Sequence, residues 1–302
     1  MREHEIFRTP KAIDHTGMVD EPSADWAEHL PGKPATVAFL PLAHAADVHE
    51  AGWCTYEQTL DHAPDVEIMC GGKNSKLPTA AAIWRQGHLL HFGFQQDPSQ
   101  LNEVGRNLLE NCIVYVAGFR GDRPLGNVRS VFRPGPRFET RGWLRSTLKN
   151  KDATAAQIAE RFFAGARREQ LAAMDIEQAK QWLDAHMTFL VPQPDGHLDA
   201  CPDLEALQLD VRAPEFVRGM RTALGGAVAT QAAGCRILHR HCAEGPRNGT
   251  EPAEAAAWTT FLEANEPYLF FSENADCSWL LDPLAKARGV PCAELRGPAR
   301  RG

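Results

Sequence analysis

The sequence predicts an α/β N-terminal part followed by a mainly α-helical C-terminal part. Between residues 80 and 119, an apolar run, a turn, a second apolar run and a helical pattern follow one another, which is the order of two strands and a packing helix. Beyond residue 152, helix-start signals repeatedly precede apolar residues at helical spacing. The chain has 302 residues, of which 43% are hydrophobic, and this suffices for one large or two ordinary domains.

The elements of the N-terminal part have recognisable boundaries. A Gly-Gly turn at Gly71 opens the segment, and the apolar run from Ala80 to Trp84 predicts its first strand. A turn is expected at Arg85–Gly87, and the apolar residues 89–94 predict a buried second strand. Pro98-Ser99 predicts the start of a helix. The apolar residues expected on its buried face are Leu101, Val104, Leu108, Leu109 and Ile113.

Residues 152–302 read as a succession of helices. Asp152 or Thr154 is expected to cap a first helix and Asp175 a second, and these two helices are expected to pack as a hairpin. Later elements are expected as helices over residues 204–209, 214–224, 228–242 and 252–265, a strand over 268–271, and a last turn or helix over 279–287. The tail from Arg296 to Gly302 is expected to be loosely held.

A basic connector separates the two parts. Residues 121–151 are rich in arginine, proline and glycine. Such a segment can bind an anionic substrate through its guanidinium groups. It can also wrap over the acidic body of the same molecule, and its apolar residues favour this second interpretation because an ordered linker needs anchors. These anchors are Phe132, Phe138, Trp143 and Leu144. We therefore expect domains at residues 1–120 and 152–302, joined by the linker 121–151.

The predicted helix carries a motif of the form GR-x-LL-x-N, made by Gly105, Arg106, Leu108, Leu109 and Asn111. With the strands before it, this motif resembles the C-terminal half of a class I glutamine amidotransferase-like domain, and more closely its ThuA-like branch, over roughly residues 1–120. The resemblance implies a flavodoxin-like sheet with ligands at the carboxyl ends of its strands. Many ThuA-like proteins are linked to sugar metabolism, so it also implies a sugar-like ligand.

Two positions depart from this family. Residues His4–Phe7 and Thr9-Pro10 resemble a segment from the middle of the ThuA-like domain, which implies an N-terminally truncated domain; a complete but diverged N-terminus is the alternative. Where glutaminase members have a His-Pro-Glu turn that supplies a base, this chain has Gln95-Gln96-Asp97. Glutamine does not accept a proton from a thiol at neutral pH, so glutaminase activity is not expected.

The C-terminal part resembles uncharacterised helical extensions that follow such domains. The residues that carry this resemblance are Trp258, Asn265, Tyr268-Leu269-Phe270, Trp279 and Asp282-Pro283-Leu284-Ala285. The aromatic residues are explained more simply as the core of a small helical domain than as a ligand platform. Asp282 is expected to cap the last helix rather than to take part in catalysis.

The candidate catalytic residues are His49, Glu50 and Glu57, in a loop that follows the apolar strand 36–40. Loops after strands carry the chemistry of α/β sheets. A histidine and carboxylates can serve as the acid and base of glycoside cleavage or proton abstraction, with Glu67 as a further carboxylate. The alternative, that these polar residues are simply solvated, is favoured by their type.

The candidate substrate-binding residues follow the Gly-Gly turn and flank the next strand: they are Lys73, Asn74, Lys76, Arg85 and His88. Backbone N–H groups and polar side chains after such a turn can hold a carboxylate, a phosphate or sugar hydroxyls. The alternative is a tight connection whose lysines are merely exposed. The convergence of polar residues on neighbouring strand ends favours a binding site.

Composition narrows the partners and cofactors. The eight cysteines form no Cys-x-x-Cys pair, and the one dense group, Cys235, His239 and Cys242, lacks a fourth zinc ligand, so neither a metal nor another cofactor is expected. The net charge of −7 argues against nucleic acid as a partner. No apolar run reaches the ~18 residues of a membrane span, and no export signal is evident. We therefore expect a cytoplasmic protein, and a homo-oligomer because a partner copy would shield an incomplete sheet.

Three functions agree with these patterns. The first is a carbohydrate-related enzyme, such as a glycoside hydrolase that uses the carboxylate and histidine candidates. The second is a non-catalytic module for ligand binding or assembly, which the lost glutaminase turn favours. The third is a metal-dependent hydrolase that uses histidines of residues 44–62 or 235–242.

Overall fold

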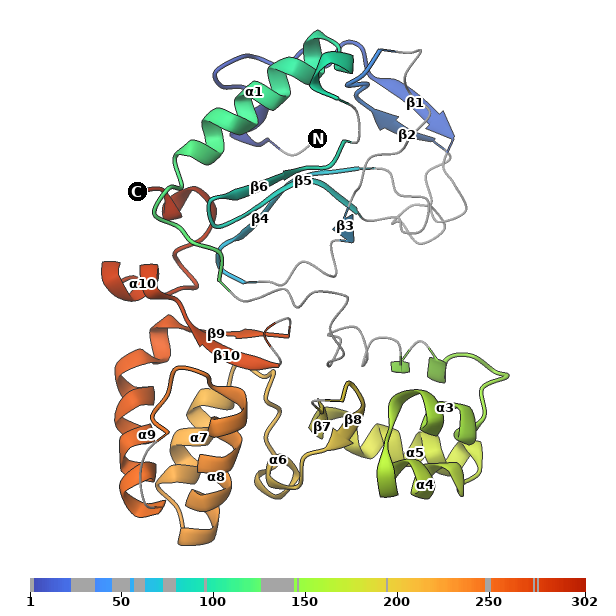
Figure 1. The fold of residues 1–302 in the computed structure, drawn as a ribbon, viewed down its shortest axis with the longest axis vertical. Helices are drawn as coiled ribbons and strands as arrows, with labels where there is room; N and C mark the ends of the chain where they lie inside the picture. The colour runs from blue at the N-terminus through green and yellow to red at the C-terminus, as the bar shows by residue number, and fades with distance from the viewer. Residues whose placement is uncertain are drawn as a thin grey trace. The chain divides into compact units, whose positions relative to one another are not determined.

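The computed structural model describes residues 3–22, 36–44, 55–56, 63–72, 80–94, 97–125, 144–145, 147–193, 195–247, 251–273, 275 and 277–302. The chain forms two compact units (Figure 1). Unit 1 consists of Met1–Leu125 together with Ala293–Gly302, and unit 2 consists of Gly126–Cys292. Unit 2 is therefore an insertion, in sequence, between the two parts of unit 1. The last ten residues, which the sequence assigned to the helical domain, belong to unit 1.

Unit 1 contains two small sheets. In the first, β1 (Val19–Pro22) pairs with β2 (Thr36–Phe39). In the second, β5 (Ala80–Gln86) is central: β4 (Val66–Gly71) pairs along one edge, while β6 (Leu89–Phe92) and the short β3 (Thr55–Tyr56) pair along the other. All these pairs are antiparallel. The prediction of a mixed α/β protein is confirmed. The parallel sheet of a flavodoxin-like fold is not found in the part of the chain that the structure describes.

The hairpin between β5 and β6 differs in register from the predicted turn. Arg85 and Gln86 continue β5, and the connection is Gly87-His88. A two-residue hairpin requires a positive φ at its first position, and Gly87 supplies it with φ +55°. β6 is also shorter than predicted, ending at Phe92, and its side chains are exposed or partly exposed rather than buried.

Helix α1 (Glu103–Ala117) covers one face of the β4–β5–β6 sheet (Figure 1). It begins five residues after the predicted start, because Pro98–Gln100 forms a separate 3-10 turn capped by Asp97, and the chain is extended at Leu101. The Asn102 side chain caps the helix by accepting a hydrogen bond from Gly105 N. The core between helix and sheet consists of Ile6, Phe7, Ile13, Leu42, Met69, Ile83, Leu108, Cys112, Tyr115 and Phe119.

The tail of the chain is fixed, contrary to the sequence-based expectation. Gly297–Arg300 forms a 3-10 helix, and Arg300 is 1% exposed. The guanidinium group of Arg300 binds Asp122 in unit 1 through two hydrogen bonds of 2.7 and 2.8 Å. The expectation was wrong because it weighed only composition and position in the chain, whereas a buried ion pair orders this segment. We call Ala293–Gly302 the closing segment.

The first half of unit 2 is helical. Its helices are α3 (Ala155–Phe162), α4 (Gly165–Ala172) and α5 (Ile176–His186). Thr154 caps α3 and Asp175 caps α5, each in a capping box, which confirms both predicted caps. The sequence predicted that the helices now called α3 and α5 follow each other as a hairpin, but a further helix, α4, lies between them in sequence. A short antiparallel pair, β7 (Leu190–Pro192) and β8 (Leu198–Ala200), follows.

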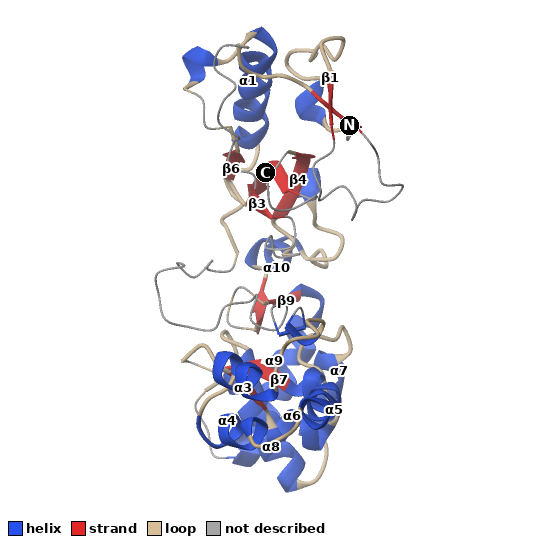
Figure 2. Cartoon of the chain, turned by 90° about the vertical axis from the view of Figure 1, so that its right-hand side faces the viewer, coloured by secondary structure: helices blue, strands red, loops and turns tan. Residues whose placement is uncertain are grey.

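The second half of unit 2 packs around a separate core that contains Trp258 and Trp279. The helices are α6 (Pro202–Leu207), α7 (Phe216–Leu224), α8 (Val228–His241), α9 (Glu251–Asn265) and α10 (Pro283–Arg288). Figure 2 shows that helices make up most of this unit. β9 (Leu269–Ser272) pairs with β10 (Ser278–Leu281), so residues 279–281, predicted as part of a turn or helix, belong to a strand instead. Asp282 caps α10, as predicted.

Candidate functional site

The structure describes three of the predicted site residues, namely Arg85, His88 and the further carboxylate Glu67. The candidates His49, Glu50, Glu57, Lys73, Asn74 and Lys76 lie outside the described residues. Arg85 and His88 both lie at the β5–β6 hairpin, three residues apart, but in different surroundings. Arg85 is fully buried, whereas His88 is exposed.

Gly87 brings this hairpin into close contact with the chain that follows α1. A side-chain Cβ at Gly87 would lie 2.5 Å from Pro124 N and 2.6 Å from Asp122 O. Two hydrogen bonds hold the same approach: Arg85 Nη1 donates to Asp122 Oδ2 at 3.1 Å, and Gln86 Nε2 donates to Leu125 O at 2.6 Å. Because residue 87 is a glycine, His88 can lie beside the turn at residues 118–123.

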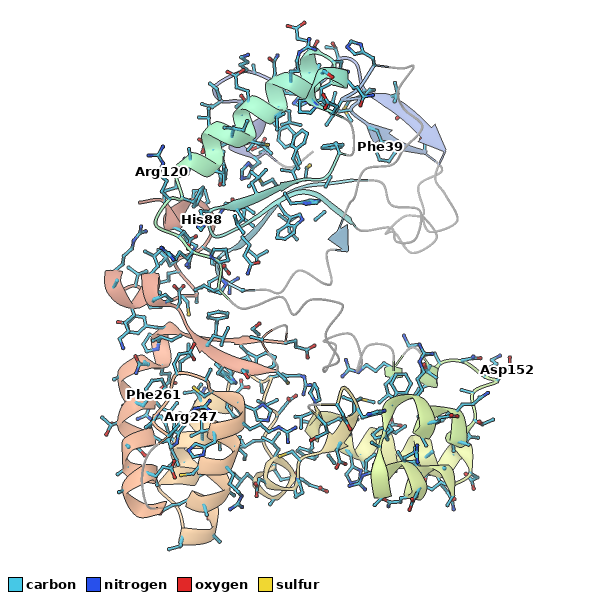
Figure 3. The ribbon with its side chains drawn as sticks, viewed as in Figure 1. Phe39, His88, Arg120, Asp152, Arg247 and Phe261 are labelled. Atoms are coloured by element: carbon cyan, nitrogen blue, oxygen red, sulfur yellow. The ribbon has the colours of Figure 1, made fainter. Side chains whose placement is uncertain are left out.

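His88, Arg120 and Arg123 line an open pocket of about 510 Å³, together with Val116 and Ala117 of α1. Figure 3 shows His88 and Arg120 near the C-terminal end of α1. We call this the basic pocket. Its volume lies within the ~300–1,000 Å³ that is usual for small-molecule sites. The two arginines give it a positive charge at neutral pH, and the valine and alanine give it an apolar wall.

The tautomer of His88 follows from its hydrogen bond. Its Nδ1 lies 3.1 Å from the Asp122 carbonyl oxygen. A carbonyl oxygen only accepts, so Nδ1 must carry the proton and donate it. Nε2 is then the atom that accepts a hydrogen bond when the ring is neutral and donates one when it is protonated. The bond therefore fixes the ring and defines which nitrogen can act on a ligand.

The end of α1 works against anion binding, but the arginines outweigh it. A helix C-terminus carries roughly half a negative charge, which disfavours an anion by about 0.3–1 kcal/mol. Part of this end is satisfied internally, because Gly118 N donates to Tyr115 O and Phe119 N donates to Val116 O. Two guanidinium groups contribute two full positive charges at the same place. The net potential of the basic pocket is therefore positive.

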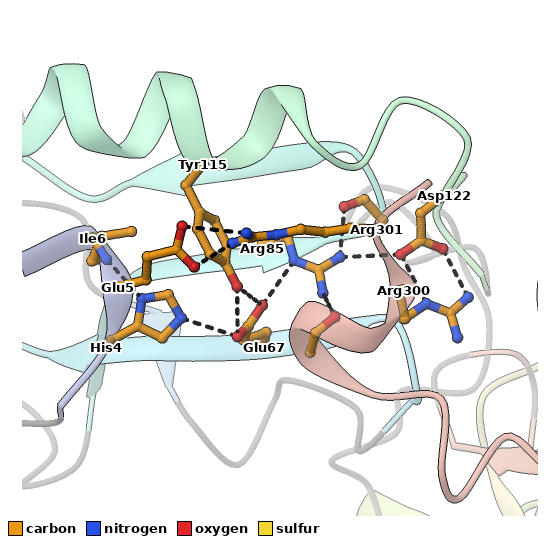
Figure 4. Close-up of polar contacts among 11 residues, drawn as sticks. His4, Glu5, Ile6, Glu67, Arg85, Tyr115, Asp122, Arg300 and Arg301 are labelled. Atoms are coloured by element: carbon orange, nitrogen blue, oxygen red, sulfur yellow. Dashed lines mark hydrogen bonds and ion pairs between the residues drawn. The ribbon is translucent and has the colours of Figure 1, made fainter. Parts of the chain in front are cut away.

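Arg85 lies in the same hairpin as His88, at the centre of a buried ion network (Figure 4). Its Nε donates to Glu67 Oε2 at 3.0 Å, and its Nη1 donates to Asp122 Oδ2 at 3.1 Å. Its guanidinium carbon lies 3.6 Å from the centre of the Phe119 ring. Since every face of this side chain is occupied, Arg85 supports the site from the interior rather than presenting itself to a ligand.

Glu67 is the acidic partner on the other side of Arg85. Burial raises the pKa of its carboxyl group, but the hydrogen bond from His4 and the attraction of Arg85 outweigh that effect, so the pKa lies below its ordinary value. His4 Nε2 lies 3.0 Å from Glu67 Oε1, and Tyr115 donates its hydroxyl to both carboxylate oxygens at 2.9 Å. His4 Nδ1 accepts a hydrogen bond from Ile6 N, so Nε2 carries the proton. Glu67 is thus an ionised structural group.

Asp65 is a buried carboxyl group of unit 1 with a strongly raised pKa. It is fully buried, and this burial raises the pKa of its carboxyl group to about 6, against the opposing effect of the hydrogen bond from Leu125. Leu125 N donates to its Oδ2 at 2.7 Å, while its Oδ1 has no hydrogen-bond partner among the described residues. Asp65 therefore changes charge near neutral pH.

Sequence reasoning missed Asp65, Asp122 and Arg300 as members of this region, and it gave anion binding by Arg120 and Arg123 only as the less favoured interpretation. Arg120 and Arg123 stood at the edge of the arginine-rich connector, which was interpreted as a wrapping linker. The sequence carries no local signal for the pairing of Asp122 with Arg300, because 178 residues separate them.

The metal interpretation of α8 finds no geometric basis. His239 forms an ion pair with Glu254, and Cys235 and Cys242 are buried in the core of unit 2. In the described part of the chain, no three His, Cys, Asp or Glu side chains are grouped as metal ligands would be. Nor does any described helix have the length and apolar character that crossing a membrane requires.

Comparison of the chain with protein-family models, with curated proteins and with solved structures gives no match. The ThuA-like resemblance therefore stays a prediction, and the candidate site rests on its own geometry.

Proposed function

We propose that unit 1 binds a small anionic molecule in the basic pocket. The observation that carries this proposal is the convergence of His88, Arg120 and Arg123 on one open pocket. Guanidinium groups bind phosphate and carboxylate through paired N–H donors, and His88 Nε2 adds a further contact. The candidate catalytic residues lie outside the described residues, so the geometry supports binding rather than a defined reaction.

The ligand that fits best is a sugar phosphate or a sugar acid. The anionic group pairs with the arginines, and the C–H face of a sugar ring packs on Val116 and Ala117. The sequence resemblance to ThuA-like proteins points to the same class of ligand. Each contact in such an exposed site contributes about 1 kcal/mol. We therefore expect a dissociation constant of roughly 0.1–1 mM, which corresponds to about 4–5.5 kcal/mol of binding free energy.

Several finer predictions from the sequence belong to the same proposal. They are a flavodoxin-like, N-terminally truncated sheet, a homo-oligomer, and a cytoplasmic location. Glycoside hydrolysis by His49, Glu50 and Glu57 is the catalytic form of the proposal, and a metal-dependent hydrolase is its alternative.

Calorimetric titration of the full chain with glucose 6-phosphate, glucose and inorganic phosphate tests the binding proposal. We expect the phosphorylated sugar to bind more tightly than glucose, and the double variant Arg120→Gln/Arg123→Gln to lose at least tenfold in affinity. Arg218→Gln, an exposed arginine of α7 in unit 2, is the matched control and should bind as the wild type does. Equal affinity of the double variant and the wild type would refute the pocket assignment.

A panel of chromogenic glycosides tests the catalytic form. Turnover that survives a chelator and is lost in Glu50→Gln or Glu57→Gln would support carboxylate chemistry. Turnover lost only with the chelator would support the metal-dependent alternative. No turnover together with phosphate-dependent binding would leave a binding module.

A further inference from the structure

The closing segment Ala293–Gly302 contacts the turn whose arginines line the basic pocket. Gly302 N donates to Gly118 O at 3.3 Å, at the start of this turn. Arg300 binds Asp122 near its end with both Nε and Nη2. Arg120 and Arg123, which line the pocket, flank Asp122 in sequence. The position of the pocket arginines therefore depends on a segment that is distant in sequence.

Asp122 connects this segment to His88. Its carboxylate accepts hydrogen bonds from Arg300 and from Arg85, and its backbone carbonyl oxygen accepts the hydrogen bond from His88 Nδ1. Asp122 is 1% exposed while the segment is docked, so its carboxylate relies on Arg300 and Arg85 rather than on water. Asp122 thus binds the closing segment through its side chain and orients His88 through its backbone carbonyl group.

Further contacts hold the closing segment in the position in which Arg300 binds Asp122. Arg300 Nη1 donates to Leu295 O within the segment, at 3.1 Å. Arg301 binds both carboxylate oxygens of Glu5, at 2.8 and 3.2 Å, and its guanidinium carbon lies 4.3 Å from the centre of the Tyr115 ring (Figure 4). The successive residues Arg300 and Arg301 therefore bind two separate carboxylates of unit 1, those of Asp122 and Glu5. Such paired guanidinium–carboxylate contacts are directional.

We propose that the closing segment regulates the basic pocket, with Arg300 as a positioning residue that acts through Asp122. This inference rests on the proposed function. When the segment is docked, Asp122 holds His88 and the turn at residues 118–123 in the binding arrangement. When the segment is released, the Asp122 carboxylate loses its bidentate partner, and the pocket loses the orientation of its histidine and arginines.

Coupling of this kind is reciprocal. If docking of the segment increases the affinity of the pocket for an anion by a given factor, the bound anion favours docking of the segment by the same factor. Bound phosphate should therefore protect the segment against proteolysis. Arg300 is a trypsin site that is buried while the segment is docked.

The test compares wild type, Arg300→Gln, Arg300→Lys and the control Arg218→Gln as full chains, with inorganic phosphate as the probe. We expect Arg300→Gln to bind phosphate at least tenfold more weakly, Arg300→Lys to recover part of this loss, and the control to be unchanged. In the wild type, phosphate should slow tryptic cleavage after Arg300. If Arg300→Gln does not fold, as judged by circular dichroism, Arg300→Lys and the cleavage assay decide the question.

Measurement of the His88 tautomer distinguishes a positioning role of Arg300 from a general effect on stability. Nitrogen NMR of the imidazole ring should report a proton on Nδ1 in the wild type and a shift toward Nε2 in Arg300→Gln at neutral pH. An unchanged tautomer together with unchanged phosphate affinity would overturn the inference while leaving the proposed function intact. Absence of phosphate binding by the wild type would instead refute the proposed function, and the tautomer alone would then decide whether Arg300 positions His88.

Discussion

At the scale of single residues, unit 1 keeps several ionisable groups in its interior. Glu67, Asp122, Arg85 and Arg300 compensate one another, with two positive and two negative side chains. Among the residues that the structure describes, Asp65 forms no ion pair, and one of its oxygens lacks a hydrogen-bond partner. A buried carboxylate in this position costs stability whenever it is ionised.

We predict that Asp65→Asn stabilises the protein most at pH 8 and about half as much at pH 5. The folded-state pKa of Asp65, about 6, exceeds its value of 3.8 in the unfolded chain, so the folded protein binds the proton more readily. The destabilisation by Asp65 is therefore fully present above pH 6 and disappears as the pH falls toward 4; at pH 8 it amounts to about 2–3 kcal/mol as an upper limit. Asparagine keeps the acceptor for Leu125 N and removes the charge.

Urea unfolding of wild type and variant at pH 5, 6, 7 and 8 measures this difference. The lower limit of pH 5 keeps Glu67, whose pKa is lowered, ionised throughout. A constant difference in unfolding free energy across the four pH values would show that Asp65 does not titrate in this range.

At the scale of elements, the β5–β6 hairpin and the turn after α1 form one local structure. The hairpin supplies His88, the turn supplies Arg120 and Arg123, and Gly87 allows the two backbones to meet. The positive φ of Gly87 and the close approach of Pro124 are separate reasons for glycine at this position. The site therefore depends on a residue that has no side chain to contribute.

We predict that Gly87→Ala destabilises unit 1 by about 3 kcal/mol and lowers its affinity for phosphate. The left-handed backbone costs alanine about 1–2 kcal/mol, and displacement of the 122–124 backbone adds about 1–3 kcal/mol. Gly121→Ala is the matched control, because a Cβ at Gly121 meets no atom within 4 Å. Chemical denaturation measures the stability of both variants, and titration measures their affinity for phosphate. Similar stabilities and affinities for Gly87→Ala and Gly121→Ala would contradict the role of Gly87.

The sequence predicted local features of the elements better than their pairing. The caps at Thr154, Asp175 and Asp282 were predictable because a capping side chain and the backbone it binds lie within a few residues. Strand direction, the buried state of Arg85 and the pairing of Asp122 with Arg300 depend on contacts between distant segments. The helical residues of α1 were predicted, but its start was not, because Pro98 fits a 3-10 turn as well as a helix.

At the scale of the whole molecule, the insertion of unit 2 divides the sequence of unit 1 into two parts. The larger part supplies the sheet and α1, and the closing segment supplies Arg300 and Arg301. Unit 2 is continuous in sequence and has hydrophobic cores made from its own residues. Unit 1 therefore needs residues from both ends of the sequence, whereas unit 2 is built from one continuous stretch.

We predict that deletion of residues 293–302 destabilises unit 1 and leaves unit 2 intact. Loss of Arg300 leaves the Asp122 carboxylate buried with Arg85 as its remaining ion-pair partner, and breaking a buried ion pair costs about 3–5 kcal/mol. Hydrogen exchange should show faster exchange in β5 and the last turns of α1, and unchanged exchange in α8 and α9. Equal acceleration in both units would contradict this independence.

The divided sequence of unit 1 also sets an order of events on the ribosome. Residues 126–292 emerge as one uninterrupted stretch and can fold as soon as they are clear of the exit tunnel. The first 125 residues are made earlier but lack Arg300, which is synthesised after all of unit 2. Unit 1 thus starts first but can be completed only after unit 2 has been synthesised, and until then Asp122 has Arg85 but not Arg300 as an ion-pair partner.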